Sequence, residues 1–126
     1  MAEINSSAYA LTHQDDIAII SISERFRALD EMHVHELSSQ LVELVKHIEP
    51  PLLVIDLGAV TYFGSSFLEV LFRLWHQLRK REGELVLCSL QEHCQEVVQI
   101  SNLDQLWKQF PDHLEAVEYL RNRYLA

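Results

Sequence analysis

Two adjacent serines, Ser65 and Ser66, are the hydroxyl-bearing residues whose position most suggests chemistry. They precede an apolar, leucine-rich segment, which is the pattern of a helix start. A hydroxyl at the N-cap can accept a hydrogen bond from the free amides of the first turn, which predicts a helix cap. The same amides and the positive end of the helix dipole would also stabilise a phosphate on either serine. The pair is therefore a helix cap or a modification site.

The segment before the serines is expected to place them at a functional edge. Leu52 to Leu57 is an almost uninterrupted apolar run between Pro50-Pro51 and Gly58, which predicts a strand buried on both faces of a parallel sheet. Asp56 is its one charge and lies near the carboxyl end. In open α/β sheets, ligands bind at the carboxyl ends of the strands and in the loops that follow them.

Other chemistry finds little support in the residue pattern. The chain has no glycine-rich phosphate loop, no nucleophile elbow, and no histidine and acid placed by sequence around Ser65. None of its seven histidines lies four residues from another, as a zinc site on a helix would require. Cys88 and Cys94 lack Cys-x-x-Cys spacing and are predicted to be reduced packing thiols. We expect no enzymatic activity, no cofactor and no metal site.

Length and charge narrow the class of protein. At 126 residues with 48% hydrophobic residues, the chain is predicted to form one domain over residues 1–126, with residues 1–7 as a flexible extension. A net charge of -9 argues against nucleic acid as a partner. No apolar run approaches the ~20 residues that span a bilayer, and the first residues lack a signal-peptide pattern. We expect a cytoplasmic protein without direct membrane insertion.

The remaining elements predict an α/β fold in the order ββαβαβαβα. A hairpin opens the chain, with its first strand at the sheet edge, and strands then alternate with helices, which requires right-handed crossovers in a mostly parallel sheet. In the last helix, Leu114, Val117, Leu120 and Tyr124 are expected to face inward. The predicted strands beside the central one are Ala8–Thr12, Ile17–Ser23, Glu84–Ser89 and Leu106–Phe110, and the predicted helices are residues 30–47, 65–81, 92–100 and 112–124.

The segment from Asp56 to Leu68, DLGAVTYFGSSFL, resembles the signature of STAS domains, the family of the bacterial anti-sigma factor antagonists. Leu29-Asp30, Gly83 to Cys88 and Ser101 to Leu103 also match family motifs, so the resemblance covers almost the whole chain. It implies a STAS-like single domain with a mostly parallel mixed sheet covered by about four helices. It also implies that Ser65, with Ser66 as second choice, matches the serine phosphorylated by a partner kinase.

Two positions depart from the family pattern. Gly64 stands where the family has an acidic residue before the serines, and Phe67 stands where it has a glycine after them. The missing carboxylate could have oriented the hydroxyl, and Phe67 adds bulk beside the acceptor. The departures fit either a different partner or a member that is never phosphorylated.

The helix after the serines carries more apolar residues than one buried stripe needs, over about 200° against the ~100° of a surface helix. Leu68, Leu71, Trp75 and Leu78 are the predicted core residues. Phe67, Val70 and Leu74 form a flank beside Ser65, which is either covered by neighbouring helices or an apolar docking patch. Arg73, Arg79, Lys80 and Arg81 are either a basic strip that attracts an acidic partner or, for the last three, a match to the helix dipole.

These observations lead to two hypotheses from different classes. The first is a non-enzymatic module, monomer or weak dimer, that binds an anti-sigma factor/serine kinase through residues 61–81 and is switched by phosphorylation of Ser65. The second is a non-phosphorylated STAS subunit of a membrane lipid-transport ABC complex, in which a transporter subunit is the partner. A small-ligand or nucleotide sensor is a third possibility that no phosphate-binding motif supports. The predicted partner-binding residues are Tyr62, Gly64, Ser65, Ser66, Phe67, Val70, Arg73 and Leu74.

Overall fold

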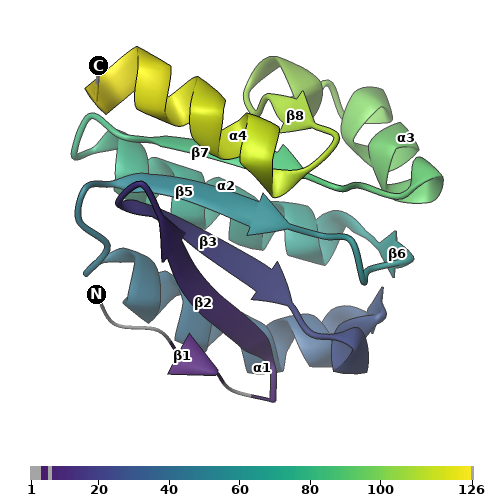
Figure 1. Cartoon of the computed structure of the whole chain (residues 1–126). Helices are drawn as coiled ribbons and strands as arrows, with labels where there is room; N and C mark the ends of the chain where they lie inside the picture. The colour runs from purple at the N-terminus through teal and green to yellow at the C-terminus, as the bar shows by residue number, and fades with distance from the viewer. Residues whose placement is uncertain (1–3, 6, 126) are drawn as a thin grey trace.

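A six-stranded sheet forms the centre of the protein, in the order β1-β2-β3-β5-β7-β8 (Figure 1). The computed structural model describes residues 4–5 and 7–125. The first two pairings are antiparallel and the remaining three are parallel, so the sheet is mixed and mostly parallel. The strands are β1 (Ile4–Asn5), β2 (Tyr9–Gln14), β3 (Ile17–Ile22), β5 (Leu52–Asp56), β7 (Glu84–Cys88) and β8 (Gln109–Phe110).

The hairpin is confirmed, but its first strand is not an edge strand. Asp15 and Asp16 both have positive φ, 52° and 67°, and connect β2 to β3 as the two central residues of a tight turn. Because β1 pairs with the other side of β2, the edge position falls to β1. Ile4–Asn5 therefore belong to the sheet, while residues 1–3 and 6 of the predicted flexible extension lie outside the described residues.

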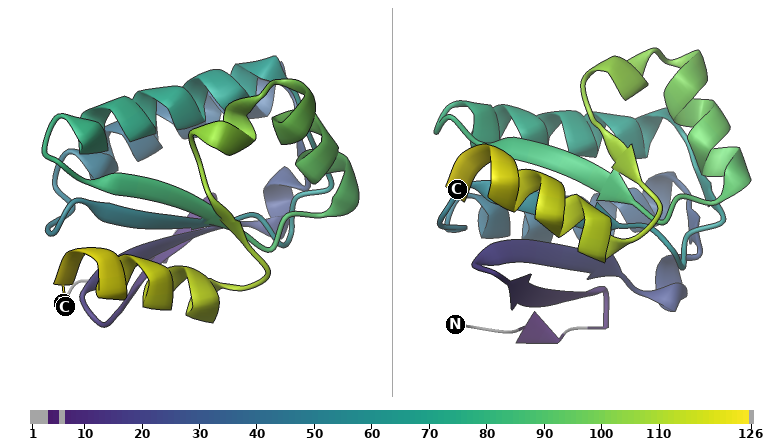
Figure 2. Two further views of the ribbon diagram at one scale, coloured as in Figure 1. Left: turned by 90° about the horizontal axis from the view of Figure 1, so that it is seen from above. Right: turned by 45° about the horizontal axis from the view of Figure 1, so that its top comes forward.

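Helices cover both faces of the sheet, with α1, α2 and α3 on one face and α4 on the other (Figure 2). The α/β class and the four expected helices are confirmed within the described residues. Three shorter helical turns, η1 (Glu24–Phe26), η2 (Leu103–Gln105) and η3 (Arg121–Leu125), complete the helical structure there. The helices are α1 (Glu31–Val45), α2 (Ser65–Arg79), α3 (Glu92–Ile100) and α4 (His113–Leu120).

Capping residues explain where two of the helices begin. The side chain of Asp30 accepts a hydrogen bond from the amide of His33 at 3.0 Å and so caps α1, close to the predicted helix start at residue 30. Asp112 caps α4 in the same way. The prediction that Leu114 faces inward is wrong, because this side chain is 55% exposed, and Ala116 fills the buried position instead.

A second, two-stranded parallel sheet was not expected from the sequence. It joins β4 (Ala28–Leu29) to β6 (Tyr62–Phe63), with Ala28 opposite Tyr62 and Leu29 opposite Phe63. Both strands have only two residues, too short to show an alternating pattern. This small sheet ties the segment before α1 to the segment before α2.

Cys88 and Cys94 are both free and buried, and their burial agrees with the predicted packing role. Burial raises the pKa of the Cys88 thiol to about 12, with a smaller contribution from the carboxylate of Asp56. Burial also raises the pKa of the Cys94 thiol to about 11. Both groups are therefore protonated, weakly reactive thiols near neutral pH.

The end of α2 depends on Glu82, and not on the glycine that follows it. Glu82, with φ of 61°, takes the left-handed position, and the amides of Glu82 and Gly83 donate to the carbonyl oxygens of Arg79 and Leu78. Gly83 is needed for a close approach, because a Cβ there would lie 1.8 Å from the carbonyl oxygen of Pro51. The last turn of α2 is thereby held against the start of β5.

Arg81 does not belong to an exposed basic strip. Its guanidinium donates hydrogen bonds to the carbonyl oxygens of Val45, Lys46 and Ile48 at the end of α1, and it pairs with Glu49 at 2.7 Å. They lie at and just after the end of α1, where the last carbonyl oxygens of a helix lack acceptor bonds from within the helix, and that of Val45 also accepts from the amide of Ile48. Arg81 therefore joins the carboxyl ends of α1 and α2.

Replacing Arg81 by alanine should lower the free energy of unfolding by about 1 to 3 kcal/mol, because the hydrogen bonds to the end of α1 are lost. Urea denaturation of the purified variant measures this loss. The matched control is Lys80→Ala, which removes an exposed cation beside Arg81 and should change stability by at most about 0.5 kcal/mol. Equal effects of the two substitutions would contradict the structural role of Arg81.

Candidate functional site

The start of α2 lies at the carboxyl end of the parallel strands, the right-hand end of the sheet in Figure 1. β6 leads directly into it. Thr61 donates from both its amide and its hydroxyl to the carbonyl oxygen of Arg27, at 2.8 and 3.2 Å. Together with the pairing of β6 to β4, these bonds fix the direction in which the chain enters the helix.

Side chains from the end of β5 and from the start of α3 hold the loop between β5 and β6 in place. One carboxylate oxygen of Asp56 accepts from the amide of Gly58 at 2.9 Å, and the side-chain amide of Gln91 donates to the carbonyl oxygen of Gly58 at 2.8 Å. The thiol of Cys94, buried under the loop, donates to the carbonyl oxygen of Val60 at 3.7 Å. Asp56, the one charge of the central strand, therefore acts in shaping this loop.

Ser65 and Ser66 do not cap α2. The N-cap is Gly64, which has no side chain to accept a hydrogen bond, and the serines are the first two helical residues. The carbonyl oxygen of Gly64 accepts from the amides of Phe67 and Leu68. Within the part of the chain that the structure describes, neither the hydroxyls nor the amides of the two serines have a hydrogen-bond partner. Ser65 is exposed and Ser66 is half-buried, so Ser65 presents its hydroxyl to solvent beside free amides.

Two hollows flank the serines, and α1 forms the opposite wall of both. The first, of about 290 Å³, lies between the start of α1 at Asp30 and Glu31 and the segment with Tyr62, Gly64 and both serines. The second, of about 170 Å³, continues along the two helices. Its polar lining residues are Glu31, His35, Ser38, Ser66, Glu69 and Arg73. Carboxylates thus predominate around the serines, with Arg73 as the cation of the second hollow.

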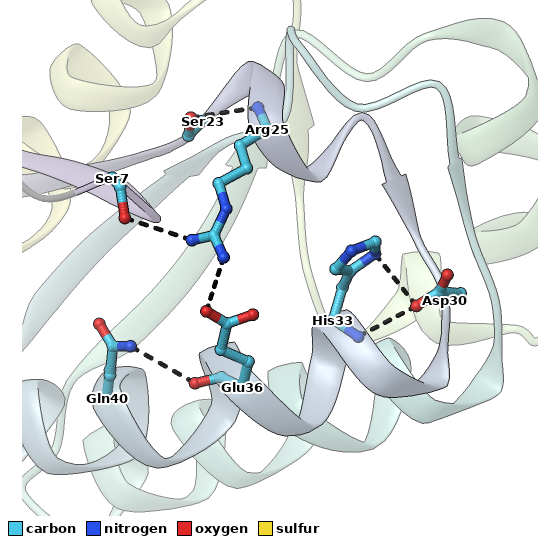
Figure 3. A network of polar contacts seen from close by, with 7 residues as sticks. All are labelled: Ser7, Ser23, Arg25, Asp30, His33, Glu36 and Gln40. Carbon is cyan, nitrogen blue, oxygen red and sulfur yellow. Dashed lines mark hydrogen bonds and ion pairs between the residues drawn. The ribbon is translucent and has the colours of Figure 1, made fainter.

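The wall formed by α1 is fixed by a polar network (Figure 3). The guanidinium of Arg25, in η1, pairs with Glu36 at 2.8 Å and donates to the hydroxyl of Ser7 at 3.2 Å. Near the first turn, the ring of His33 lies 3.1 Å from the carboxylate of Asp30 and packs edge-on against Phe26. The residues of α1 that face the serines are therefore held by contacts on the other side of that helix.

The predicted apolar docking flank of α2 is wrong, and the alternative of a deeply covered helix is correct. Phe67 and Leu74 are fully buried and Val70 is only 4% exposed, because all three pack in the main core between the helices and the sheet. Phe67 also contacts the ring of Phe63, with 5.2 Å between ring centroids. The exposed apolar residues of this region are Tyr62 and Phe72, each 46% exposed. Phe67 consequently adds no bulk beside the hydroxyl of Ser65.

The side chain of Tyr62 lies close to Gly64, which bears on why position 64 has no side chain. The hydroxyl of Tyr62 lies 3.2 Å from the point where a Cβ on residue 64 would stand. The ring of Tyr62 stacks on the imidazole of His93 in α3, with centroids 5.5 Å apart and planes at 20°. A Cβ at position 64 would therefore make a tight contact with the end of the Tyr62 side chain, beside Ser65.

Gly64→Asp should displace the ring of Tyr62 from His93, because the new side chain and the phenol compete for one space. In NMR spectra, the ring protons of His93 should lose the ring-current shift that Tyr62 causes, and stability should fall by about 0.5 to 1.5 kcal/mol. His93→Ala is the control, since it removes the stacked pair without touching residue 64. Unchanged His93 signals in Gly64→Asp would contradict the competition.

Tyr62, Gly64, Ser65, Ser66 and Arg73 are the predicted site residues that the structure brings together at the two hollows, and the largely buried Val70 also lines the second one. Sequence reasoning missed Glu31, His35 and Glu69, which line the same hollows, and it missed His93. The strand order contained a signal for α1, because two consecutive right-handed crossovers place their helices side by side with their amino ends at one edge. Nothing comparable in the sequence points to the stacking of His93.

The described residues form neither a metal site nor a membrane-spanning helix. No group of three or more His, Cys, Asp or Glu side chains is arranged to hold a metal ion there. No helix formed by those residues is both long enough and apolar enough to cross a bilayer.

Comparison with known proteins shows which family this chain resembles. The family model described as "STAS domain" matches residues 8–116. A solved STAS domain protein from Planctomyces limnophilus, described as an anti-sigma-factor antagonist, is 30% identical and superposes with a TM-score of 0.84. That match covers 92% of this chain and 99% of the other.

Two further relatives are more limited in what they show. BtrV of Bordetella bronchiseptica, named as a candidate anti-sigma factor antagonist, is 48% identical over 48 residues, which are 38% of this chain and 41% of that protein. The match thus spans less than half the length of this relative. The anti-sigma factor antagonist SpoIIAA in its unphosphorylated form is 16% identical with a TM-score of 0.74, over 91% of this chain and 97% of the other, and shows the fold alone.

Proposed function

The chain belongs to the STAS domain family, and from this we propose that it is a regulatory interaction module which binds an anti-sigma factor with serine kinase activity. The observation that carries the proposal is Ser65 itself, exposed as the first residue of α2 and with its hydroxyl unbonded within the described residues. The names of its relatives support the class of partner, because both BtrV and the protein from Planctomyces limnophilus are described as anti-sigma factor antagonists.

In the unmodified state, the partner contacts the surface at the start of α2. Tyr62, Gly64, Ser65 and Ser66 supply a surface with one exposed phenol ring, two serine hydroxyls and no charged side chain. Arg73, which has no ion pair among the described residues, lies on the same side and is available to an acidic group of the partner. The rigid contacts of β6 and of α1 keep this surface in one shape.

Phosphorylation of Ser65 then weakens the complex. A phosphate adds about 1.5 to 2 negative charges and three acceptor oxygens. It is stabilised in place by the free amides of the first turn of α2 and by the helix dipole. Because Glu31 and Glu69 already line the neighbouring hollows, the added charge makes one side of the contact surface strongly negative. A partner fitted to the neutral serine loses affinity.

The chain itself plays the part of substrate in this scheme. Neither serine hydroxyl is hydrogen-bonded to a base within the described residues, so the structure offers no preformed means of activating them. The partner kinase supplies the catalytic base and transfers the γ-phosphoryl group of ATP to the Ser65 oxygen. The Ser65 proton passes to that base, and ADP leaves.

The test is in vitro phosphorylation by the partner captured from the source cells. Wild-type protein, Ser65→Ala and Ser66→Ala are incubated with the captured kinase and γ-labelled ATP. We expect label in the wild type and in Ser66→Ala, and none in Ser65→Ala. Equal labelling of all three variants, or capture of a transporter ATPase in place of a kinase, would overturn the proposal.

A further inference from the structure

A third hollow, of about 250 Å³ and lined by both polar and apolar residues, lies at the opposite end of α2 from Ser65. It is lined by Trp75 and Arg79 of α2, by Leu106 and Lys108 before β8, and by Tyr119 of α4. With 1.5 Å of rise per residue, Arg79 lies about 21 Å along the helix from Ser65. This hollow is therefore separate from the surface of the proposed function, and the inference below does not rest on that function.

Exposed apolar side chains border the hollow. The rings of Phe72 and Trp75 are in contact, with centroids 5.2 Å apart, and Phe72 is 46% exposed. Leu106, on the other side of the hollow, is 38% exposed. Trp75 is only partly buried and packs against the outside of the main core. Exposed apolar side chains thus stand on both sides of the hollow, Phe72 beside Trp75 on one and Leu106 on the other.

The charges at this hollow are partly unpaired. Glu84 is 14% exposed and its carboxylate is already engaged, since Tyr119 donates to it at 3.2 Å and Arg123 lies 3.5 Å away. Arg79 and Lys108 make no ion pair with any described residue, although Lys108 stands 5.8 Å over the ring of Tyr119. Asp104 is the other carboxylate of the lining. Asp104 also makes no ion pair with a described residue, and because the lining holds the cations Arg79, Lys108 and Arg123 against the carboxylates of Glu84 and Asp104, a net positive charge remains to attract an anion.

We infer that this hollow binds an acidic peptide segment of a partner protein, with carboxylates paired to Arg79 and Lys108 and an apolar side chain seated on Phe72, Trp75 and Leu106. Aromatic and arginine side chains beside an apolar pocket are the composition of binding hot spots. The whole chain carries a net charge of -9, so its own surface would repel an acidic segment except at a local group of cations such as this one.

The occupant is identified by differential selection. A random peptide library displayed on phage is selected on the full-length protein after depletion on a double variant, Arg79→Glu with Lys108→Glu. Depletion removes peptides that bind elsewhere, including those that bind near Ser65. The selected peptides should be rich in Asp and Glu and should contain Leu or an aromatic residue. No enrichment, or enrichment without an acidic bias, would overturn the inference.

Affinity is then measured by tryptophan fluorescence with the most enriched peptide. Trp107 is fully buried, so a change on peptide addition reports Trp75. Arg79→Glu should raise the dissociation constant about tenfold or more, because it replaces attraction by repulsion at a contacting group. Lys80→Glu reverses the same charge one residue further along, outside the lining, and should raise it by no more than about threefold. Equal effects of the two variants would contradict the site.

A second copy of this chain is the competing occupant. Sedimentation velocity at increasing protein concentration detects self-association of the chain. We expect that Arg79→Glu does not reduce any association that is observed. Self-association through this surface would overturn the inference of a separate acidic partner. Ser65→Asp separates this inference from the proposed function. The variant should leave peptide affinity at the hollow unchanged, whether or not Ser65 controls binding of a kinase.

Discussion

Ser65→Asp should weaken binding of the cognate kinase by about 10- to 100-fold, which corresponds to about 1.4 to 2.7 kcal/mol. The substitution places a carboxylate at the first position of α2, between a neutral contact surface and hollows already lined by Glu31 and Glu69. The same carboxylate lies beside free amides and the positive end of the helix dipole, so the protein itself should become more stable by about 0.3 to 1 kcal/mol. Calorimetric titration and urea denaturation measure the two effects, which have opposite signs.

Two controls isolate the charge from the shape of the new side chain. Ser65→Asn has nearly the volume of aspartate without its charge and should retain most of the affinity. Ser39→Asp introduces the same charge at another exposed serine, on α1 and outside both hollows, and should change binding little. Loss of binding in Ser65→Asn equal to that in Ser65→Asp would show that steric fit, and not charge, controls the complex.

Phe67→Ala should destabilise the fold by about 3 to 5 kcal/mol, because it empties a fully buried position. The lost contacts include the ring of Phe63, 5.2 Å away, and the core that α2 shares with the sheet. Urea denaturation gives the change in free energy of unfolding. An effect of this size would identify Phe67 as a core residue and not as part of a docking surface.

The matched control is Phe72→Ala, the same substitution one and a half turns further along α2. Phe72 is 46% exposed, so its removal should cost no more than about 1 kcal/mol. Under the inference made above, it should instead weaken peptide binding at the hollow beside Trp75. Equal losses of stability at the two positions, or a stable Phe67→Ala that fails to bind the kinase, would restore the docking flank that the sequence suggested.

The strands and helices that bury a continuous apolar pattern could be predicted from sequence. The run from Leu52 to Ile55 is buried on both faces, as its composition indicates, and α3 has the expected bounds. The short strands could not be predicted, because β1, β4 and β6 have two residues each and depend on partners distant in sequence. Local pattern has no information on such pairings.

The candidate site was predictable in position but not in detail. The strand, loop and paired serines indicated that Ser65 opens a helix at the carboxyl edge of the sheet. They could not decide which apolar residues of α2 are covered, since that depends on how α1 packs against Val70 and Leu74. They also could not show that Tyr62 fills the space at Gly64, because this follows from stacking on His93 in a helix that comes 30 residues later.

The departures from the family pattern can now be weighed on physical grounds. Phe67 points into the core, so this departure changes packing and leaves the serine accessible. Gly64 leaves room for the phenol of Tyr62, which is a different polar group beside the acceptor serine. Because Phe67 leaves Ser65 accessible, it gives no support to the hypothesis of a non-phosphorylated transporter subunit. Our proposal therefore keeps phosphorylation of Ser65 as the event that controls partner binding.

The most direct test of that control is the intact mass of the protein purified from its own cells, with peptide mapping of the segment that contains Ser65 and Ser66. We expect a fraction of the molecules to carry one phosphate, located on Ser65, and this fraction to change with growth or stress conditions. A protein that is unmodified under every condition, or modified only on Ser66, would contradict it.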